Sequence, residues 1–213
     1  MEFSELIDLV KDQPLFDTGQ LLSGKVDPDY IRKQLSLWLN TGKIIQLRRG
    51  LYSLASPYQK VRIHPFMLAN RLYSPSYVSY QSALSYYGLI PEGVYTIVSA
   101  TTRKTKDWET QLGNFKYHSM QKEWFSGYTS TELDDKEFAF IAQPEKALLD
   151  LVLLTPQGDS PAFLDELRLQ NLEAVDLSGM QTLVNLADKP KLNRFFIHFK
   201  QLLQQQAKGS RRL

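Results

Sequence analysis

Residues 44–56 constrain the fold of this chain more than any other stretch. Their sequence, IIQLRRGLYSLAS, places Arg48, Arg49 and Gly50 between two short runs in which apolar residues alternate. Ile, Tyr and Leu in alternation are typical of β-strands, and a short connection ending in glycine is typical of a hairpin, because glycine adopts φ > 0 readily. The stretch therefore predicts two antiparallel strands joined by a three-residue connection. Two adjacent arginines have no use in a globular core, so we expect the tip to meet a partner.

Two helical patterns open the chain. Apolar residues at helical spacing predict a first helix over about residues 4–11. A second, short helix follows, capped by Asp17 or Thr18 and ended by Gly24. A third helix is predicted between the second helix and the hairpin.

This third helix has the clearest start in the chain. Asp27 suits the N-cap, Pro28 the first helical position and Asp29 the positive first turn, and the helix is expected to end near Thr41. Its apolar residues define a buried face: Ile31, Leu35, Trp38 and Leu39. The opposite face and its flank are basic and hydrogen-bonding, with one apolar member: Tyr30, Arg32, Lys33, Ser36, Leu37 and Asn40. Long donors reach phosphates and Ser or Asn can read base edges, so this face suits the major groove of DNA.

The order of these elements predicts a winged helix-turn-helix over residues 1–57. A mixed α/β domain is expected over residues 58–213, which makes the whole chain α+β. In a winged helix the third helix enters the major groove, and the hairpin tip can reach the neighbouring backbone or minor groove. Arg48 and Arg49 would then contact DNA, since a guanidinium matches phosphate oxygens. The alternative is a module that binds another protein through the same basic surface.

Charge is unevenly distributed along the chain, although the net charge is only +2. Residues 30–91 contain no Asp or Glu and eight Lys or Arg, whereas residues 92–188 contain 16 acids and eight bases. The segment after Asp188 again has no acid and has seven bases. A long acid-free span favours polyanions, and nucleic acid is the first candidate. A solvated basic face without a partner is the alternative.

Beyond Pro57 helical and strand patterns mix. Helices are expected over about residues 65–72, 79–88, 144–154, 161–168, 180–186 and 191–205, and strands over 94–102, 114–120 and 137–142. Ser79 is the expected cap of the second of these helices, and residues 130–137 are expected to form a polar turn. The basic block Arg103, Lys104 and Lys106 is either an exposed turn or a second phosphate contact. Phe195, Phe196, Phe199 and Leu202 indicate core packing, or an interface with a second copy or a toxin.

Three segments, in order, resemble the AbiEi antitoxins: LRRGLYSLA, YVSYQSALSYYGLIPE and IAQPEKALLDLVLL. These proteins are the regulator half of an abortive-infection toxin–antitoxin pair, and the similarity covers about residues 3–155. The resemblance implies a winged helix that binds inverted repeats in double-stranded DNA and represses its own operon. It also implies a C-terminal domain needed to neutralise a nucleotidyltransferase toxin, while a stand-alone regulator is the alternative. By matching position, it places the DNA-binding role on five cations: Arg32, Lys33, Lys43, Arg48 and Arg49.

No catalytic residue, metal site or cofactor is expected. The chain has no cysteine, and His64, His118 and His198 lack the spacing of zinc ligands. A magnesium-dependent nuclease would need a carboxylate cluster, for which the candidates are Asp134, Asp135, Glu137 and Glu145. A solvated turn and a helix-dipole partner explain these acids more simply. No apolar stretch suits a membrane span or a signal peptide, so we expect a cytoplasmic protein.

Overall fold

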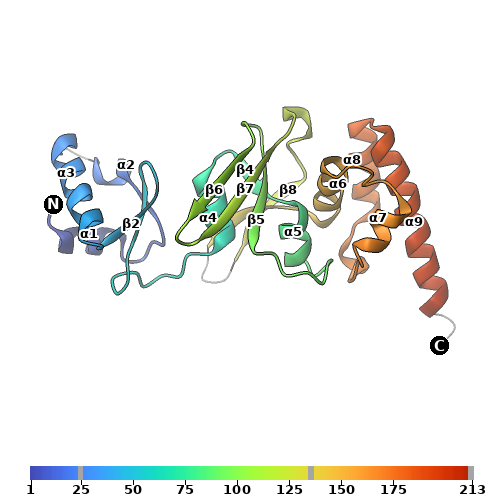
Figure 1. Cartoon of the computed structure of the whole chain (residues 1–213), viewed down its shortest axis with the longest axis horizontal. Helices are drawn as coiled ribbons and strands as arrows, with labels where there is room; N and C mark the ends of the chain where they lie inside the picture. Colours follow the sequence, from blue (N-terminus) through green and yellow to red (C-terminus); the bar gives the residue numbers. More distant parts are fainter. Residues whose placement is uncertain (24–25, 134–136, 211–213) are drawn as a thin grey trace.

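The computed structural model describes residues 1–23, 26–133 and 137–210. It is a mixed α+β structure, with nine α-helices and two β-sheets in this part of the chain. The elements follow one another along a long axis, from an N-terminal unit through a central sheet to a group of C-terminal helices (Figure 1). Among the described residues, no helix combines the length and the apolar character needed to cross a membrane.

The N-terminal unit contains three helices and a small antiparallel sheet. Its elements are α1 (Phe3–Val10), β1 (Phe16–Asp17), α2 (Thr18–Leu21), α3 (Pro28–Asn40), β2 (Ile44–Arg48) and β3 (Leu51–Leu54), and the strand order is β1-β3-β2. The predicted order of three helices and a hairpin is confirmed, whereas β1 was not expected. Gly24, the expected end of the second helix, lies outside the described residues.

Local signals determine where α3 begins and which side it buries. The Asp27 side chain accepts a hydrogen bond from the Asp29 amide at 2.9 Å, as an N-cap does. Ile31, Leu35 and Trp38 are buried in a core shared with α1 and the hairpin, and Leu39 is partly buried. The predicted inner and outer faces of this helix are therefore confirmed.

The hairpin packs against two cores at once. Ile44, Tyr52 and Leu54 belong to the core of the N-terminal unit. Leu47 and Leu51 belong instead to the larger core of the rest of the chain. A bulge between Gln46 and Arg48 shifts the pairing with β3, and this turns the end of β2.

The hairpin connection is shorter than predicted. Since β2 continues through Arg48, only Arg49 and Gly50 join the two strands. Gly50 has φ +80°, a conformation that L side chains rarely adopt, so glycine is required here as expected.

The central sheet has six strands in the order β6-β7-β5-β4-β9-β8. They are β4 (Ser76–Val78), β5 (Thr96–Thr101), β6 (Lys106–Thr110), β7 (Gly113–Ser119), β8 (Tyr128–Glu132) and β9 (Phe138–Ala142). The pairs β4–β9 and β5–β7 are parallel, and the other pairs are antiparallel. Strands β5, β7 and β9 confirm the predictions, but the expected turn over residues 130–137 is wrong in its first part. Residues 130–132 belong to β8 because they pair with β9.

Helices cover both faces of this sheet. On one face lies α4 (Pro65–Leu72), whose Ala69 carbonyl accepts a hydrogen bond from the Tyr117 hydroxyl of β7 at 2.8 Å. On the other lie α5 (Tyr80–Tyr86) and α6 (Pro144–Leu154), with the 3-10 turn η1 (Lys122–Trp124). The remaining elements pack beyond α6: α7 (Pro161–Glu166), η3 (Leu172–Ala174), α8 (Leu177–Ala187) and α9 (Pro190–Ser210). Phe195, Phe196 and Phe199 of α9 are buried in the larger core, so core packing accounts for this stripe.

A buried ion pair joins α6 to the sheet. Lys146 pairs with Asp150 one turn later, and both side chains are fully buried. Lys146 Nζ also donates to the Tyr77 hydroxyl at 2.7 Å, while Asp150 accepts from Trp124 Nε1 at 2.7 Å and from the Ser79 hydroxyl at 2.8 Å. Burial lowers the pKa of Lys146. Ser79 was expected to cap α5, but the structure shows no cap bond from its side chain and directs its hydroxyl to Asp150 instead.

Replacing Asp150 by alanine is expected to destabilise the protein by about 3–5 kcal/mol, because the Lys146 ammonium is left buried without a counter-charge. The double change Lys146→Met with Asp150→Leu should cost less, since it removes both charges. Urea unfolding followed by circular dichroism measures both. Glu92→Gln, which removes the exposed pair with Arg168, is the control and should hardly move the midpoint. Equal midpoints for Asp150→Ala and wild type would contradict this account.

Candidate nucleic-acid interface

The outer face of α3 is accessible along its length. Lys33, Ser36 and Asn40 are exposed, and Leu37 is 54% exposed. Arg32 is exposed and pairs with Asp29 at 2.6 Å. The Tyr30 hydroxyl accepts a hydrogen bond from the Met1 amine at 3.0 Å.

A groove of about 620 Å³ lies between α3 and the hairpin tip. Arg32 and Ser36 line it from α3, Arg49 and Gly50 line it from the tip, and Thr18 lines it from the start of α2. The Thr18 amide donates to the Gly50 carbonyl at 3.0 Å, which attaches the tip to α2. No Asp or Glu is among the described residues that line the groove. We call this space the α3–tip groove.

The two arginines look alike in the sequence, but the structure separates them. Arg48 is half-buried, and its Nε donates to the Arg71 carbonyl of α4 at 3.2 Å while its Nη1 donates to the Arg49 carbonyl at 3.1 Å. Arg49 is exposed, and its side chain has no hydrogen bond or ion pair with any described residue. Arg48 therefore attaches the hairpin to α4, and Arg49 is the arginine available to a ligand.

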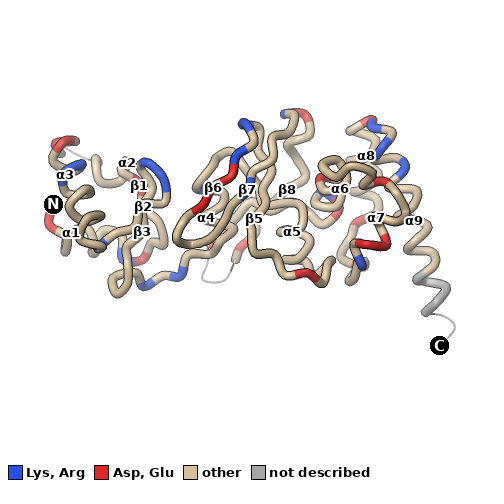
Figure 2. Tube along the Cα trace, in the orientation of Figure 1, with Lys and Arg blue, Asp and Glu red and all other residues tan. Residues whose placement is uncertain are grey.

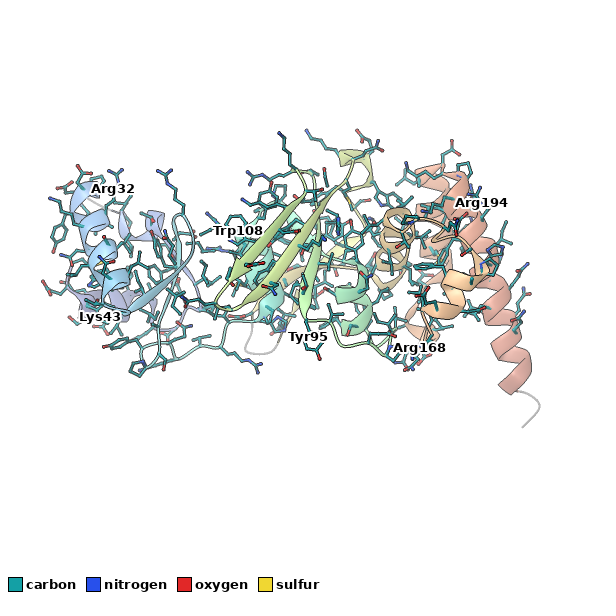
Figure 3. The ribbon with its side chains drawn as sticks, in the orientation of Figure 1. Arg32, Lys43, Tyr95, Trp108, Arg168 and Arg194 are labelled. Atoms are coloured by element: carbon teal, nitrogen blue, oxygen red, sulfur yellow. The ribbon has the colours of Figure 1, made fainter. Side chains whose placement is uncertain are left out.

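Four more of the predicted contacts lie outside the α3–tip groove: Tyr30, Lys33, Asn40 and Lys43. Figure 3 shows Arg32 and Lys43 at opposite ends of α3. The Lys43 ammonium lies 4.7 Å from the centroid of the Phe3 ring, so a cation–π contact holds it against α1. Tyr30, Lys33 and Asn40 are on α3 but do not line the groove. The structure thus brings Arg32, Ser36 and Arg49 together around one space. Thr18 also lines the groove. The sequence had indicated Thr18 only as one of two candidate caps of the second helix.

The described residues assemble no metal site. No group of three or more His, Asp or Glu among them could hold an ion. His64 caps α4, burial lowers the pKa of His118, and His198 contacts the Asp159 carbonyl at 2.9 Å. Of the acids considered for magnesium, Glu137 accepts from the His64 amide at 3.2 Å, and burial raises the pKa of Glu145. Asp134 and Asp135 lie outside the described residues.

No family model matches the chain, and no curated protein matches it either. The groove and the charged side chains that line it are therefore the features from which a function is inferred.

The single variants Arg48→Ala and Arg49→Ala should differ in their free energy of unfolding. Arg48→Ala is expected to lower the free energy of unfolding by about 1 kcal/mol, because it removes two hydrogen bonds and part of the packing of the hairpin. Arg49→Ala, the matched neighbour, should stay within about 0.5 kcal/mol of wild type. Urea unfolding of the three proteins measures the difference. If Arg49→Ala lowered the free energy of unfolding more than Arg48→Ala, Arg49 and not Arg48 would be the arginine that attaches the hairpin to the rest of the protein.

Proposed function

We propose that the chain is a DNA-binding transcriptional regulator whose N-terminal unit is a winged helix-turn-helix. In this proposal α3 enters the major groove of a duplex and Arg49 at the hairpin tip contacts the adjacent phosphate backbone. The observation that carries the proposal is the α3–tip groove, where a capped helix and an unpaired arginine face the same space without an acid in the described lining.

The dimensions of α3 suit the major groove. An α-helix with its side chains is about 10–12 Å across, and the major groove is about 12 Å wide. Ser36 and Asn40 are spaced by four residues, so they lie on one side of the helix and can hydrogen-bond to base edges. The exposed Leu37 can contact a thymine methyl group, which gives a role to an apolar side chain on a polar face.

Electrostatics supports the same partner. Of the eight cations in the acid-free span 30–91, two have ion pairs among the described residues, which are Arg32 with Asp29 and Arg71 with Asp17. The side chains of Arg32 and Asp29 are each 73% exposed, so their ion pair contributes about 0–1 kcal/mol to stability. Arg32 can therefore exchange Asp29 for a phosphate. Arg48 is left out of the proposed contacts because hydrogen bonds to two backbone carbonyls hold its half-buried side chain against the end of α4.

The resemblance to AbiEi antitoxins adds two parts to the proposal. The DNA site is an inverted repeat upstream of the chain's own gene, which calls for two copies of the protein related by two-fold symmetry. The residues beyond the N-terminal unit antagonise a nucleotidyltransferase toxin. We propose no catalytic residue and no cofactor.

DNA binding is tested by fluorescence anisotropy on a duplex taken from upstream of the gene. Lys33→Ala with Arg49→Ala should weaken binding roughly 10- to 30-fold at about 150 mM salt, because two phosphate contacts are lost. The plot of log affinity against log salt should become less steep by about 1.8. Lys122→Ala with Lys200→Ala removes the same charge far from α3 and should leave both values unchanged.

Two results would contradict the proposal. One is a wild-type protein that shows no salt-sensitive binding to duplex DNA but co-purifies with an acidic protein, which favours the protein-interaction module. The other is a double variant with the affinity and salt dependence of wild type.

The antitoxin role is tested by co-expression. A nucleotidyltransferase encoded beside the gene should arrest growth when it is expressed alone, and the full chain should restore growth. Lys33→Ala with Arg49→Ala should still restore it, because the change leaves the C-terminal part intact. Arrest that the wild-type chain does not relieve would remove the antitoxin role from the proposal.

A further inference from the structure

A second basic pocket lies between the hairpin tip and the edge of the six-stranded sheet. It has a volume of about 310 Å³. The residues that characterise it are Arg48, Arg49, Tyr73, Arg103, Lys106 and Trp108. Four of the six are cations, and its described lining includes no Asp or Glu. We call this space the tip–edge pocket.

The geometry of β6 gathers positive charge on one side. Successive side chains of a strand point to opposite faces, so Lys106 and Trp108 share a face while Asp107 and Glu109 point away. Lys106 and Trp108 line the pocket together with Arg48 and Arg49, so this basic side of the edge strand β6 lies beside the hairpin of the N-terminal unit. Figure 3 shows Trp108 in the part of the sheet nearest that unit. In Figure 2 the basic hairpin tip and the basic residues before β6 both lie toward the upper edge of the view.

Aromatic rings position the cations without neutralising them. The Arg103 guanidinium carbon lies 4.4 Å from the centroid of the Tyr73 ring, and its Nη1 donates to the Ser74 carbonyl at 3.2 Å. Lys106 Nζ lies 3.9 Å from the centroid of the Trp108 ring. Among the described residues neither cation has an ion pair, so most of their N–H donors are available. Cations held in place in this way lose less conformational entropy when an anion binds.

We propose that the tip–edge pocket binds the phosphate backbone of the duplex held by α3, with Arg103 and Lys106 each contacting a phosphate. The inference rests on the proposed function, because it assumes that DNA occupies the α3–tip groove. Arg49 lines both spaces and therefore joins them into one basic path. The DNA backbone leaves the groove over the hairpin tip and passes onto the edge of the central sheet. The part of the chain that contains the six-stranded sheet then contributes to DNA affinity directly, in addition to packing against the N-terminal unit.

The test compares two charge-matched variants on the duplex that wild type binds. Arg103→Gln with Lys106→Gln is expected to weaken binding roughly 10- to 30-fold at about 150 mM salt and to reduce the salt slope by about 1.8, because two phosphate contacts are lost. Lys116→Gln with Lys122→Gln is the control. Lys116 pairs with Asp107 in the β6–β7 register and so lies on the other face of the sheet. This control should bind as wild type does, and circular dichroism should show that both variants are folded.

Trp108 gives a second readout, since it lines the pocket while Trp38 and Trp124 are buried. The duplex should change the tryptophan fluorescence of wild type, and the change should be lost in Trp108→Phe. If inorganic phosphate produces the change and the duplex does not, the pocket is a site for a free anion and the inference is wrong. If wild type binds the duplex and Arg103→Gln with Lys106→Gln binds it equally well, the inference fails and the proposed function stands. If wild type binds no duplex, both fail.

Discussion

The packing of one hairpin between two hydrophobic cores is the constraint on which the rest of the account depends. Tyr52 and Leu54 hold it against α1 and α3, while Leu47 and Leu51 hold it against the core of the central domain. Burying each leucine contributes about 1.5–3 kcal/mol, so neither contact is easily given up. The tip that carries Arg49 is consequently fixed relative to α3 on one side and to the edge of the sheet on the other.

Much of the N-terminal unit could be predicted because its signals are local. Asp27 and Pro28 mark the start of α3 within two residues, and Gly50 marks a turn that needs φ > 0. The outer face of α3 followed from helical periodicity, so the candidate residues on it were accessible from sequence alone. In the central domain the same reasoning found α4, α6 and three of the six strands, each of which has a clear pattern of its own.

What the sequence could not show depends on contacts between distant residues. Lys146 and Asp150 can be buried because Tyr77, Ser79 and Trp124, which come from separate parts of the chain, hydrogen-bond to them. Strand β8 forms because it pairs with β9, although residues 130–132 were predicted to lie in a polar turn. The different surroundings of Arg48 and Arg49 arise from a bulge and from the end of α4.

In the proposed complex α3 and the hairpin tip bind one duplex, and Arg49, not Arg48, contacts its backbone. NMR spectra of the arginine Nε–Hε groups, assigned with single Arg→Lys variants and recorded while the duplex is added, test it most directly. The Arg49 signal should move in proportion to the bound fraction, whereas the Arg48 signal should keep its position because its Nε stays bonded to the Arg71 carbonyl. An Arg49 signal that does not move at saturating duplex would contradict the account.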